Sequence, residues 1–231
     1  MLELLNNITH KDLRVITERG AQWGDDVMSC PVTADEFRSL QAHYPIVFQQ
    51  DGQGNFLPVV LFGLQEGQNL FLDDKGWDAE YLPLAMQRMP FSIGVAQAEL
   101  RMMVDMASPR ISRGAEGEAV FLPHGGNTDF IEKANSVLRV LHEGLESTKE
   151  FVGALVANNL LESFVLKVDR PDGSQGQLLG YFMIHEERLA ALDASTVGLL
   201  HQADYLQPIY MAIASMSNLA QLIRRHLARE A

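Results

Sequence analysis

The sequence predicts an α+β fold with an antiparallel, β-rich N-terminal half (1–112) and a C-terminal half (113–231) of helix–hairpin–helix type. Two observations support this prediction. Aromatic residues, prolines and turn glycines are densest between Ala42 and Phe91, which is typical of a packed antiparallel sheet. Beyond residue 127, apolar residues recur at spacings of three and four, the period of an amphipathic helix. We expect the halves to form two domains or one integrated domain.

Two short strands and one short helix are predicted before residue 43. Residues 12–16 alternate polar with apolar side chains, and residues 27–32 form a second β-prone run. Thr33 and Glu36 have the spacing of a capping box, in which the side chain of each residue accepts the backbone N–H of the other. A helix is therefore expected to begin there and to continue to about residue 42.

An antiparallel meander is predicted next. The runs 46–48 and 57–64 flank a polar turn at 51–55 that contains two glycines, so they predict a β-hairpin. A second turn at 65–67 leads to a third expected strand over 69–72.

A short helix and two more strands complete the N-terminal half. The helix is expected over residues 80–89, with Pro83 tolerated in its first turn and Pro90 at its end. The strands are expected at 91–95 and 100–104, because both runs are rich in β-branched or other apolar residues.

The C-terminal half follows a turn-rich connection over residues 108–127. An amphipathic helix is predicted for 128–158, with a possible break near Gly144. The runs 160–168 and 177–184 flank a Pro-Asp-Gly turn and predict a second hairpin. Three further helices are predicted, over residues 186–192, 195–203 and 207–228.

Composition and charge argue against several classes of protein. The chain carries 18 basic and 30 acidic residues, a net charge of −12, which disfavours nucleic-acid binding and adsorption to anionic lipid. Its apolar runs are shorter than the roughly 20 residues that span a bilayer, so no membrane insertion is predicted. The first residues lack a secretory signal pattern, and the single Cys30 fits a reducing compartment. A cytoplasmic location is expected.

One basic cluster stands out, at the C-terminal end of the last predicted helix. It consists of Arg224, Arg225, His226 and Arg229. Cations complement the dipole at a helix C-terminus, and this interpretation is favoured over a site for a polyanion.

No catalytic motif is present. The sequence lacks a nucleophile elbow, a phosphate-binding loop and a dinucleotide fingerprint. The closest two histidines, His185 and His201, are 16 residues apart, whereas zinc ligands usually occur in closely spaced pairs. We therefore predict no catalytic residue, no metal and no cofactor.

Seven residues are candidates for ligand binding. They are His43, Tyr44, Trp77, Tyr81, Phe91, Asp105 and Arg110. The aromatic members could line a pocket, although aromatic residues of a small sheet more often belong to the core. His43 could equally hold a structural hydrogen bond. A site assembled from His43, Asp105 and Arg110 is the form that an enzyme would take.

Short segments spread over the chain form a distinctive ordered set. They include 43–48, 61–64, 67–73, 76–77, 81–83 and 88–91, then Asp105, 108–110, 180–182, 186–192, 209–210 and 217–219. This ordered set resembles the SapC family of bacterial proteins over nearly the whole chain. The chain departs from the family pattern where Met106 follows Asp105 in place of a glutamate. It departs again at 122–126, where members often carry an acidic stretch.

The resemblance implies a role without a mechanism. The family name implies a part in a bacterial surface layer or in its export, and members resemble gene-cluster neighbours of halogenase-like and oxygenase-like proteins. The favoured hypothesis is a non-catalytic cytoplasmic accessory protein that self-associates or binds a halogenase-like or oxygenase-like protein partner. The alternatives are a component or export factor of a surface layer, and an enzyme whose site combines distant residues.

Overall fold

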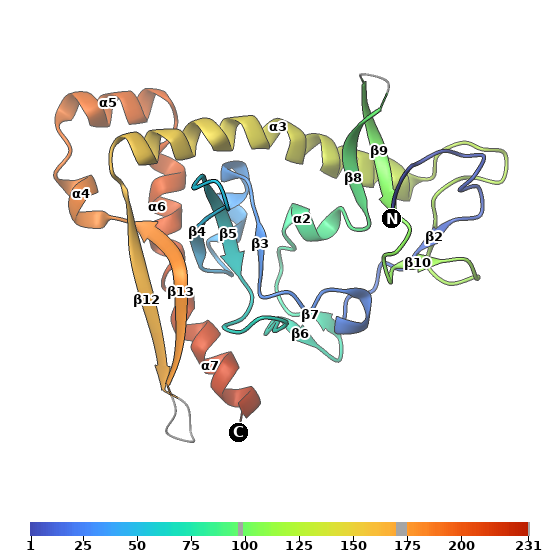
Figure 1. The fold of residues 1–231 in the computed structure, drawn as a ribbon, viewed down its shortest axis with the longest axis horizontal. Coiled ribbons are helices and arrows are strands. Elements are labelled where there is room, and N and C mark those ends of the chain that lie inside the picture. Colours follow the sequence, from blue (N-terminus) through green and yellow to red (C-terminus); the bar gives the residue numbers. More distant parts are fainter. Residues whose placement is uncertain (97–98, 170–174, 231) are drawn as a thin grey trace. The chain divides into compact units, whose positions relative to one another are not determined.

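A computed structural model describes residues 1–96, 99–169 and 175–230 of the chain. Its sheets are antiparallel and alternate with helices of very different length, so the predicted α+β class is confirmed (Figure 1). Contacts divide the chain into two compact units. The first unit contains Met1–Asp26, Leu72–Asp78 and Leu84–Glu143, and the second contains Val27–Phe71, Ala79–Pro83 and Gly144–Ala231. Both units contain segments from before and after residue 112. The division of the chain into two halves at residue 112 stays a prediction.

In the described part of the first unit the strands form three small antiparallel sheets. The largest has the order β1-β9-β8 and consists of β1 (Leu2–Leu4), β9 (Glu99–Asp105) and β8 (Phe91–Ala96). In the second sheet β2 (Arg14–Val15) lies between β10 (Ile111–Ser112) and β11 (Glu118–Ala119), and in the third β6 (Leu72–Asp73) pairs with β7 (Gly76–Trp77). β8 and β9 are the two strands that the sequence predicted at 91–95 and 100–104, and the structure pairs them.

An apolar cluster lies in the core of the first unit. It joins the first two sheets to the first turns of α3 (Asp129–Ala157) and includes Leu13, Val15, Phe91, Val104, Val120, Phe121, Ile131, Ala134 and Leu138. The short elements η1 (Ala21–Trp23) and α2 (Leu84–Gln87) belong to the same unit. The helix predicted over 80–89 is therefore much shorter, because Pro83 lies just before it and the backbone turns again at Phe91, whose N–H donates to the carbonyl of Arg88.

The second unit contains a five-stranded antiparallel sheet of order β12-β13-β4-β5-β3 (Figure 1). Its strands are β3 (Ser29–Pro31), β4 (Ile46–Gln50), β5 (Phe56–Leu61), β12 (Leu161–Asp169) and β13 (Gln175–Ile184). Both predicted hairpins, β4–β5 and β12–β13, are present. The predicted Pro-Asp-Gly turn falls on residues 170–174, which lie outside the described residues.

The predicted third strand of the meander, over 69–72, is wrong. Only Leu72 is in a strand, and it pairs with Trp77. The side-chain carbonyl of Asn69 accepts the N–H of Phe71 at 2.9 Å, and the N–H of Leu70 donates to the carbonyl of Phe62. An asparagine that bonds its own backbone two residues later offers the chain an alternative to a sheet ladder.

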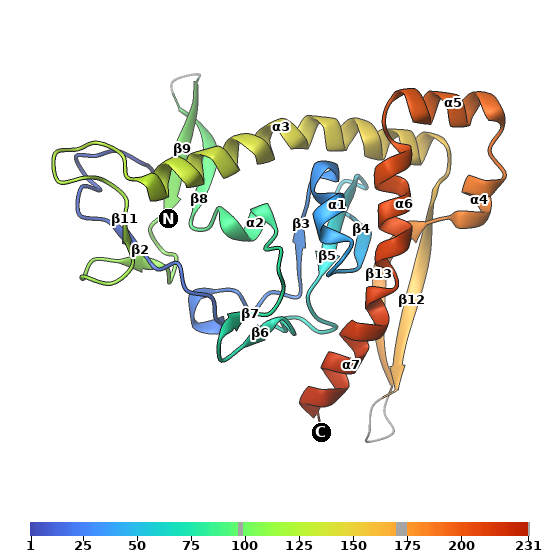
Figure 2. The same ribbon diagram turned by 180° about the vertical axis from the view of Figure 1, so that it is seen from behind.

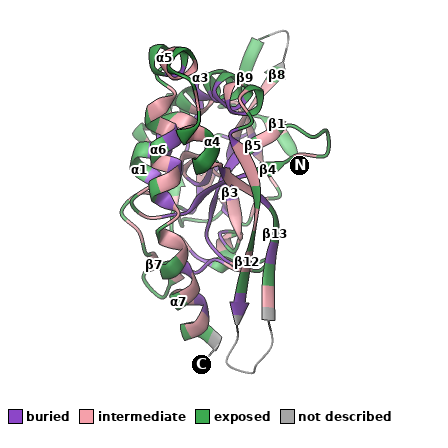
Figure 3. Cartoon of the chain, turned by 90° about the vertical axis from the view of Figure 1, so that its left-hand side faces the viewer, coloured by how far each residue is buried: buried purple, intermediate pink, exposed green. Residues whose placement is uncertain are grey.

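Short helices cover this sheet. η2 (Ala34–Glu36) and α1 (Phe37–Leu40) begin at the predicted capping box, in which the Glu36 carboxylate accepts the N–H of Thr33 at 3.1 Å. α1 lies beside α6 (Leu206–Ser215), which also contacts β4 and β13 (Figure 2). By contrast, α4 (Glu186–Ala190) and α5 (Ala194–Gln202) are largely exposed (Figure 3).

The last helix is broken, although one continuous helix was predicted over 207–228. α6 ends at Ser215 and α7 (Asn218–Glu230) begins three residues later. The Ser215 hydroxyl donates to the carbonyl of Ala212 and accepts the N–H of Ile46, while the Asn218 amide donates to the carbonyl of Gln41 at 2.8 Å. These tertiary hydrogen bonds stabilise a tight turn that the apolar periodicity does not reveal.

The C-terminal basic cluster attaches α7 to the segment 68–71. Arg225 donates to the carbonyl of Leu70 and lies 4.6 Å from the centre of the Phe71 ring, and Arg229 donates to the carbonyl of Asn69. His226 is buried and lies 3.2 Å from the Gln68 amide. These side chains therefore serve packing within the second unit more than the dipole of their own helix.

The long helix α3 runs without a break, contrary to the interruption predicted near Gly144. A Cβ atom at Gly144 would lie 3.0 Å from Cβ and Cγ2 of Thr33, which is closer than side chains normally approach. The glycine therefore permits close packing of two segments and does not end the helix. The other glycine of the same unit's part of the helix, Gly153, is exposed and has open space at its Cα.

These two glycines predict opposite responses to alanine. Gly153→Ala should raise the free energy of unfolding by about 0.5–1 kcal/mol, the usual gain for alanine in an exposed helix interior. Gly144→Ala should lose that gain, because the new methyl group meets Thr33. Urea unfolding followed by circular dichroism measures both. Equal stabilisation by the two substitutions would show that the Gly144–Thr33 approach is not a constraint.

Candidate functional site

The second unit contains three of the predicted site residues, His43, Tyr44 and Tyr81. Tyr44 is fully buried, contacts the rings of Phe62 and Phe71, and donates its hydroxyl to the carbonyl of Tyr81 at 2.5 Å. The partly buried His43 packs its ring edgewise against Tyr44. These residues form part of the core, so their arrangement is that of a structural aromatic cluster.

Tyr81 lies at the edge of this cluster. Its hydroxyl donates to Glu36 at 3.2 Å, and Glu36 also accepts the N–H of Thr33. Burial, followed by the negative charge of Glu36, raises the pKa of Tyr81 well above its usual value near 10. The neutral phenol of Tyr81 donates a hydrogen bond to the Glu36 carboxylate, and this hydrogen bond favours the neutral form of the tyrosine.

This shift predicts a stability loss at alkaline pH. A folded-state pKa above the unfolded one gives a contribution that is present below about pH 10 and is lost as the pH rises toward the folded value. The urea midpoint of the wild type should therefore fall more steeply above pH 10 than that of Tyr81→Phe. Tyr210→Phe, at an exposed tyrosine, is the control and should retain the wild-type slope. Parallel slopes for the wild type and Tyr81→Phe would contradict the prediction.

The first unit contains the other four predicted residues, Trp77, Phe91, Asp105 and Arg110. Trp77 pairs with Leu72 in the small β6–β7 sheet, and Phe91 is buried in the apolar cluster. Asp105 accepts the N-terminal ammonium at 2.7 Å and the N–H of Ala107 at 3.0 Å, and the ammonium hydrogen bond lowers the pKa of this carboxyl. None of these roles requires a ligand.

Among the seven predicted site residues, Arg110 makes the most side-chain hydrogen bonds that the structure describes. Its side chain is 1% exposed, as is that of Asp25, and its Nη2 lies 2.6 Å from both carboxylate oxygens of Asp25. Its Nη1 donates to the carbonyls of Ile16 and Glu18 at 2.9 and 2.8 Å. Asp25 also accepts the N–H of Gly20. This guanidinium organises the segment 16–25 from within the fold.

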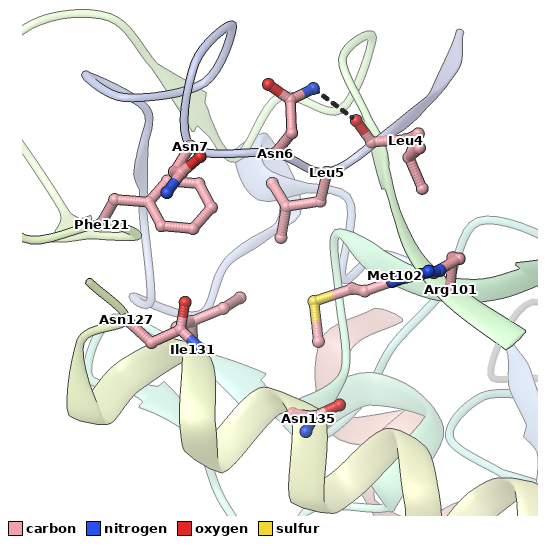
Figure 4. Close-up of a pocket in the computed structure, with 10 residues that line it drawn as sticks. All are labelled: Leu4, Leu5, Asn6, Asn7, Arg101, Met102, Phe121, Asn127, Ile131 and Asn135. Carbon is pink, nitrogen blue, oxygen red and sulfur yellow. Dashed lines mark hydrogen bonds between the residues drawn. The ribbon is translucent and has the colours of Figure 1, made fainter. Parts of the chain in front are cut away.

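A pocket elsewhere in the first unit is the better candidate for a binding site (Figure 4). It has a volume of about 560 Å³, which lies in the usual range for the binding site of a small ligand. A side chain of another protein would also fit in it. Its floor is apolar and contains Leu5, Met102, Phe121 and Ile131, with Leu4 beside it. Its polar residues are Asn6, Asn7, Asn127, Asn135 and Arg101. We call it the asparagine-lined pocket.

The N-terminal side of the pocket is formed where the chain leaves β1. The N–H of Leu5 donates to the carbonyl of Met102, which extends the pairing with β9 by one residue. The Asn6 side chain then accepts the N–H groups of Ile8 and Thr9. It also donates to the carbonyl of Leu4, and Figure 4 shows this hydrogen bond as a dashed line. An asparagine in this position stabilises a turn through local hydrogen bonds.

His10 stabilises this turn through a hydrogen bond to its backbone. It is buried, its Nδ1 accepts the N–H of Asn6 at 3.3 Å, and its Nε2 lies 3.3 Å from Glu3. An accepting Nδ1 leaves the ring proton on Nε2, where it donates to the Glu3 carboxylate. Both ring nitrogens are therefore engaged in hydrogen bonds, so the role of His10 is to support the turn.

The opposite side of the pocket comes from the loop before α3 and from its first turns. Phe121 pairs with Asn127 across a small loop, and Asn7 donates to the carbonyl of Gly125 in that loop at 2.7 Å. The Asn127 amide donates to Glu132 at 2.6 Å. Ile131 and Asn135 are one helical turn apart, so their side chains lie on the same face of α3.

The lining suits binding more than catalysis. Side-chain amides offer hydrogen-bond donors and acceptors without an acid–base function, and the Arg101 guanidinium offers donors only. None of the described residues that line the pocket is a carboxylate, histidine, cysteine, serine or lysine. The pocket therefore has no group in its lining to serve as a nucleophile or as a general acid or base.

A neighbouring cavity of about 450 Å³ is a weaker candidate. It is lined by side chains of both signs, among them Glu3, Lys11, Asp12 and Arg113. Lys11 and Asp12 are exposed and lie 3.8 Å apart. Adjacent opposite charges largely cancel one another's field, so this cavity has no clear preference for the charge of a ligand. Within the described part of the chain, no group of three His, Cys, Asp or Glu residues is placed to hold a metal ion.

The sequence contained only a faint signal of the asparagine-lined pocket. Asn6 and Asn7 are adjacent near the N-terminus, and Asn127 and Asn135 lie at and beyond the start of the long helix. Asparagine is common in turns, so these residues have an ordinary interpretation. The four amides come together through tertiary contacts, among them the hydrogen bond from Asn7 to the carbonyl of Gly125 in the loop before α3.

Comparison of the chain with models of known protein families identifies the family to which it belongs. The family model named SapC matches residues 5–222 of this chain. The chain belongs to the SapC family. The SapC match includes every residue of the asparagine-lined pocket except Leu4. Neither the curated proteins nor the solved structures gave this SapC chain a match.

Proposed function

We propose that this SapC-family protein is a non-catalytic accessory protein that binds a polar ligand in the asparagine-lined pocket and leaves it chemically unchanged. The observation that carries the proposal is the lining itself. Asn6, Asn7, Asn127 and Asn135 surround an apolar floor, and Arg101 is the only charged residue among the described lining residues. Such a site recognises hydrogen-bonding groups and apolar surface together.

The available amide groups support this proposal. Asn135 is exposed on α3, and within the described residues its side chain makes no hydrogen bond. Asn7 and Asn127 each use the side-chain N–H₂ group in an internal hydrogen bond, at 2.7 and 2.6 Å, which leaves the side-chain oxygen as an acceptor. A ligand therefore meets acceptors held in place by the fold, which lowers the entropy lost on binding.

The setting of this function is also proposed. A cytoplasmic accessory role beside a halogenase-like or oxygenase-like partner would use a binding site of this kind to hold a segment or product of that partner. None of the helices in the described part of the chain has the length and hydropathy to cross a bilayer. Fractionation of the host bacterium is the direct test of location, because recovery of the protein in the surface layer would favour the alternative role there.

The pocket itself is tested by filling it. Asn135→Trp introduces a large ring at the exposed edge of the pocket, and Ser136→Trp places the same ring on the neighbouring, exposed position of α3, which does not line it. Native mass spectrometry of protein purified gently from its own host should show a bound molecule in the wild type and Ser136→Trp. The affinity for that molecule should fall at least roughly tenfold in Asn135→Trp, which corresponds to a loss of about 1.4 kcal/mol and lowers the occupancy.

Two outcomes would contradict the proposal. One is retention of the bound molecule in Asn135→Trp, which would place it elsewhere on the protein. The other is chemical turnover of the bound molecule by the purified wild type, which would make the protein an enzyme.

A further inference from the structure

The strand β1, beside the asparagine-lined pocket, indicates which chemical class of ligand the pocket binds. β1 is an edge strand, because the first sheet has the order β1-β9-β8 and β1 pairs only with β9. Leu4 belongs both to β1 and to the lining of the asparagine-lined pocket. The open edge of β1 and the pocket therefore form one continuous surface within the first unit.

The hydrogen bonds of β1 show which backbone groups are open. The carbonyl of Met1 accepts the N–H of Met106, and the N–H of Leu5 donates to the carbonyl of Met102. In an antiparallel ladder the bonded positions alternate, so the N–H and C=O groups of Leu2 and Leu4 point away from β9. Of these four groups, the described residues provide a partner for one, the carbonyl of Leu4, which accepts the Asn6 amide.

The side chains around this edge are apolar and exposed. Leu2 is 60% exposed and Leu4 is 42% exposed. Leu2 lies opposite Asp105 and Leu4 opposite Met103, so both leucines lie on one face of the sheet. The exposed pair Leu100 and Val95 lies on the other face, with Met102. Open backbone groups flanked by exposed apolar side chains are the features of an edge that accepts another strand.

We infer that the ligand of the asparagine-lined pocket is an extended peptide segment of a partner protein, which adds to β1 as a further antiparallel or parallel strand. This inference rests on the proposed function of the pocket. The peptide backbone pairs with the open groups of Leu2 and Leu4, and one apolar side chain enters the pocket. The amides of Asn7, Asn127 and Asn135 complement the peptide groups that follow. Such strand addition derives affinity from main-chain hydrogen bonds and specificity from alternate side chains.

The charge of the partner segment follows from Arg101. It is the only charged residue among the described lining residues, in a chain with a net charge of −12. Its ion pair with Glu99 is exposed, with side chains 50% and 64% accessible, so the guanidinium can exchange this carboxylate for another at little cost. The peptide is therefore expected to carry a carboxylate side chain near its apolar anchor.

Selection of peptides on the full chain tests the inference. A displayed library of random dodecapeptides is selected on the wild type, and enriched sequences are synthesised with acetylated and amidated ends. We expect them to contain an apolar residue near an acidic one and to bind the wild type. Leu4→Pro removes one open N–H without removing a bond to β9, whereas Leu4→Val keeps it. Binding should weaken roughly tenfold in Leu4→Pro and in Asn135→Trp, and little in Leu4→Val and Ser136→Trp.

A second measurement guards against misfolding of the proline variant. Amide hydrogen exchange of Leu2 and Leu4 in the wild type should slow at least roughly tenfold when the peptide is added, because these N–H groups become hydrogen-bonded. Unchanged exchange at both amides, or binding that ignores Leu4→Pro and Asn135→Trp, would overturn the inference.

The charge is tested separately. Arg101→Glu should weaken peptide binding several-fold, and Arg139→Glu, on the exposed face of α3 and outside the pocket lining, is the matched control. Failure to enrich any peptide would also overturn the inference. The proposed function would still stand if the wild type purified from its host carries a bound molecule that Asn135→Trp lacks. Failure of the peptide inference can therefore be distinguished from failure of the proposed function.

Discussion

Replacing Arg110 by methionine should lower the free energy of unfolding by about 3–5 kcal/mol, the usual result of removing one partner from a buried ion pair. The Asp25 carboxylate, 1% exposed, would keep the weaker contact with Arg19 at 3.3 Å and the N–H of Gly20 but would lose its closest cation. The carbonyls of Ile16 and Glu18 would lose their donor as well. Urea unfolding monitored by circular dichroism measures the loss.

Two further variants make this prediction specific. Arg101→Met breaks an exposed ion pair with Glu99 and should change stability by less than about 1 kcal/mol. The double variant Arg110→Met, Asp25→Leu should recover part of the loss, because no buried charge remains unpaired. A change below 1 kcal/mol for Arg110→Met would contradict the structural role, and it would return Arg110 to the list of candidate ligand-binding residues.

Replacing Tyr44 by alanine should also cost about 3–5 kcal/mol, because the side chain is fully buried and its removal leaves a cavity. Its ring contacts Phe62 and Phe71 at centroid distances of 5.4 and 4.7 Å, so the loss includes both aromatic contacts. Tyr44→Phe retains the ring and removes only the hydroxyl that donates to the carbonyl of Tyr81. That variant should cost about 1 kcal/mol.

The neighbouring histidine is the control for this prediction. His43 is partly exposed and contacts the cluster only with its ring edge, so His43→Ala should cost about 1 kcal/mol or less. Thermal unfolding of the three variants measures the order of effects. If Tyr44→Ala were tolerated, or if His43→Ala removed an activity without lowering stability, the aromatic cluster would have a functional role in place of the structural one.

Several elements could be predicted from the sequence because their signals are local. The β4–β5 hairpin follows from two apolar runs on either side of a polar turn, the strands β8 and β9 follow from apolar, β-prone runs, and α3 follows from apolar residues at helical spacing. The capping box at Thr33 and Glu36 is a pattern of four residues. Each of these signals lies within a few residues of the structure that it specifies.

The candidate site could not be predicted in the same way. The seven residues proposed for ligand binding are aromatic or charged, and such side chains look alike in sequence whether they face a ligand or the core. Arg110 was singled out for its charge, yet its partner Asp25 is 85 positions away. The asparagine-lined pocket joins segments near residues 6, 101 and 127, and no local pattern connects them.

The sequence by itself determined the α+β class, most of the regular elements and membership of the SapC family. Only the tertiary structure decided where α6 ends, why Gly144 is small and which polar residues meet in a pocket. These features depend on contacts between distant segments, such as Ser215 with Ile46 and Asn7 with Gly125. Local propensity is overruled wherever such contacts satisfy backbone groups or exclude a side chain, and neither effect can be seen until the chain is folded.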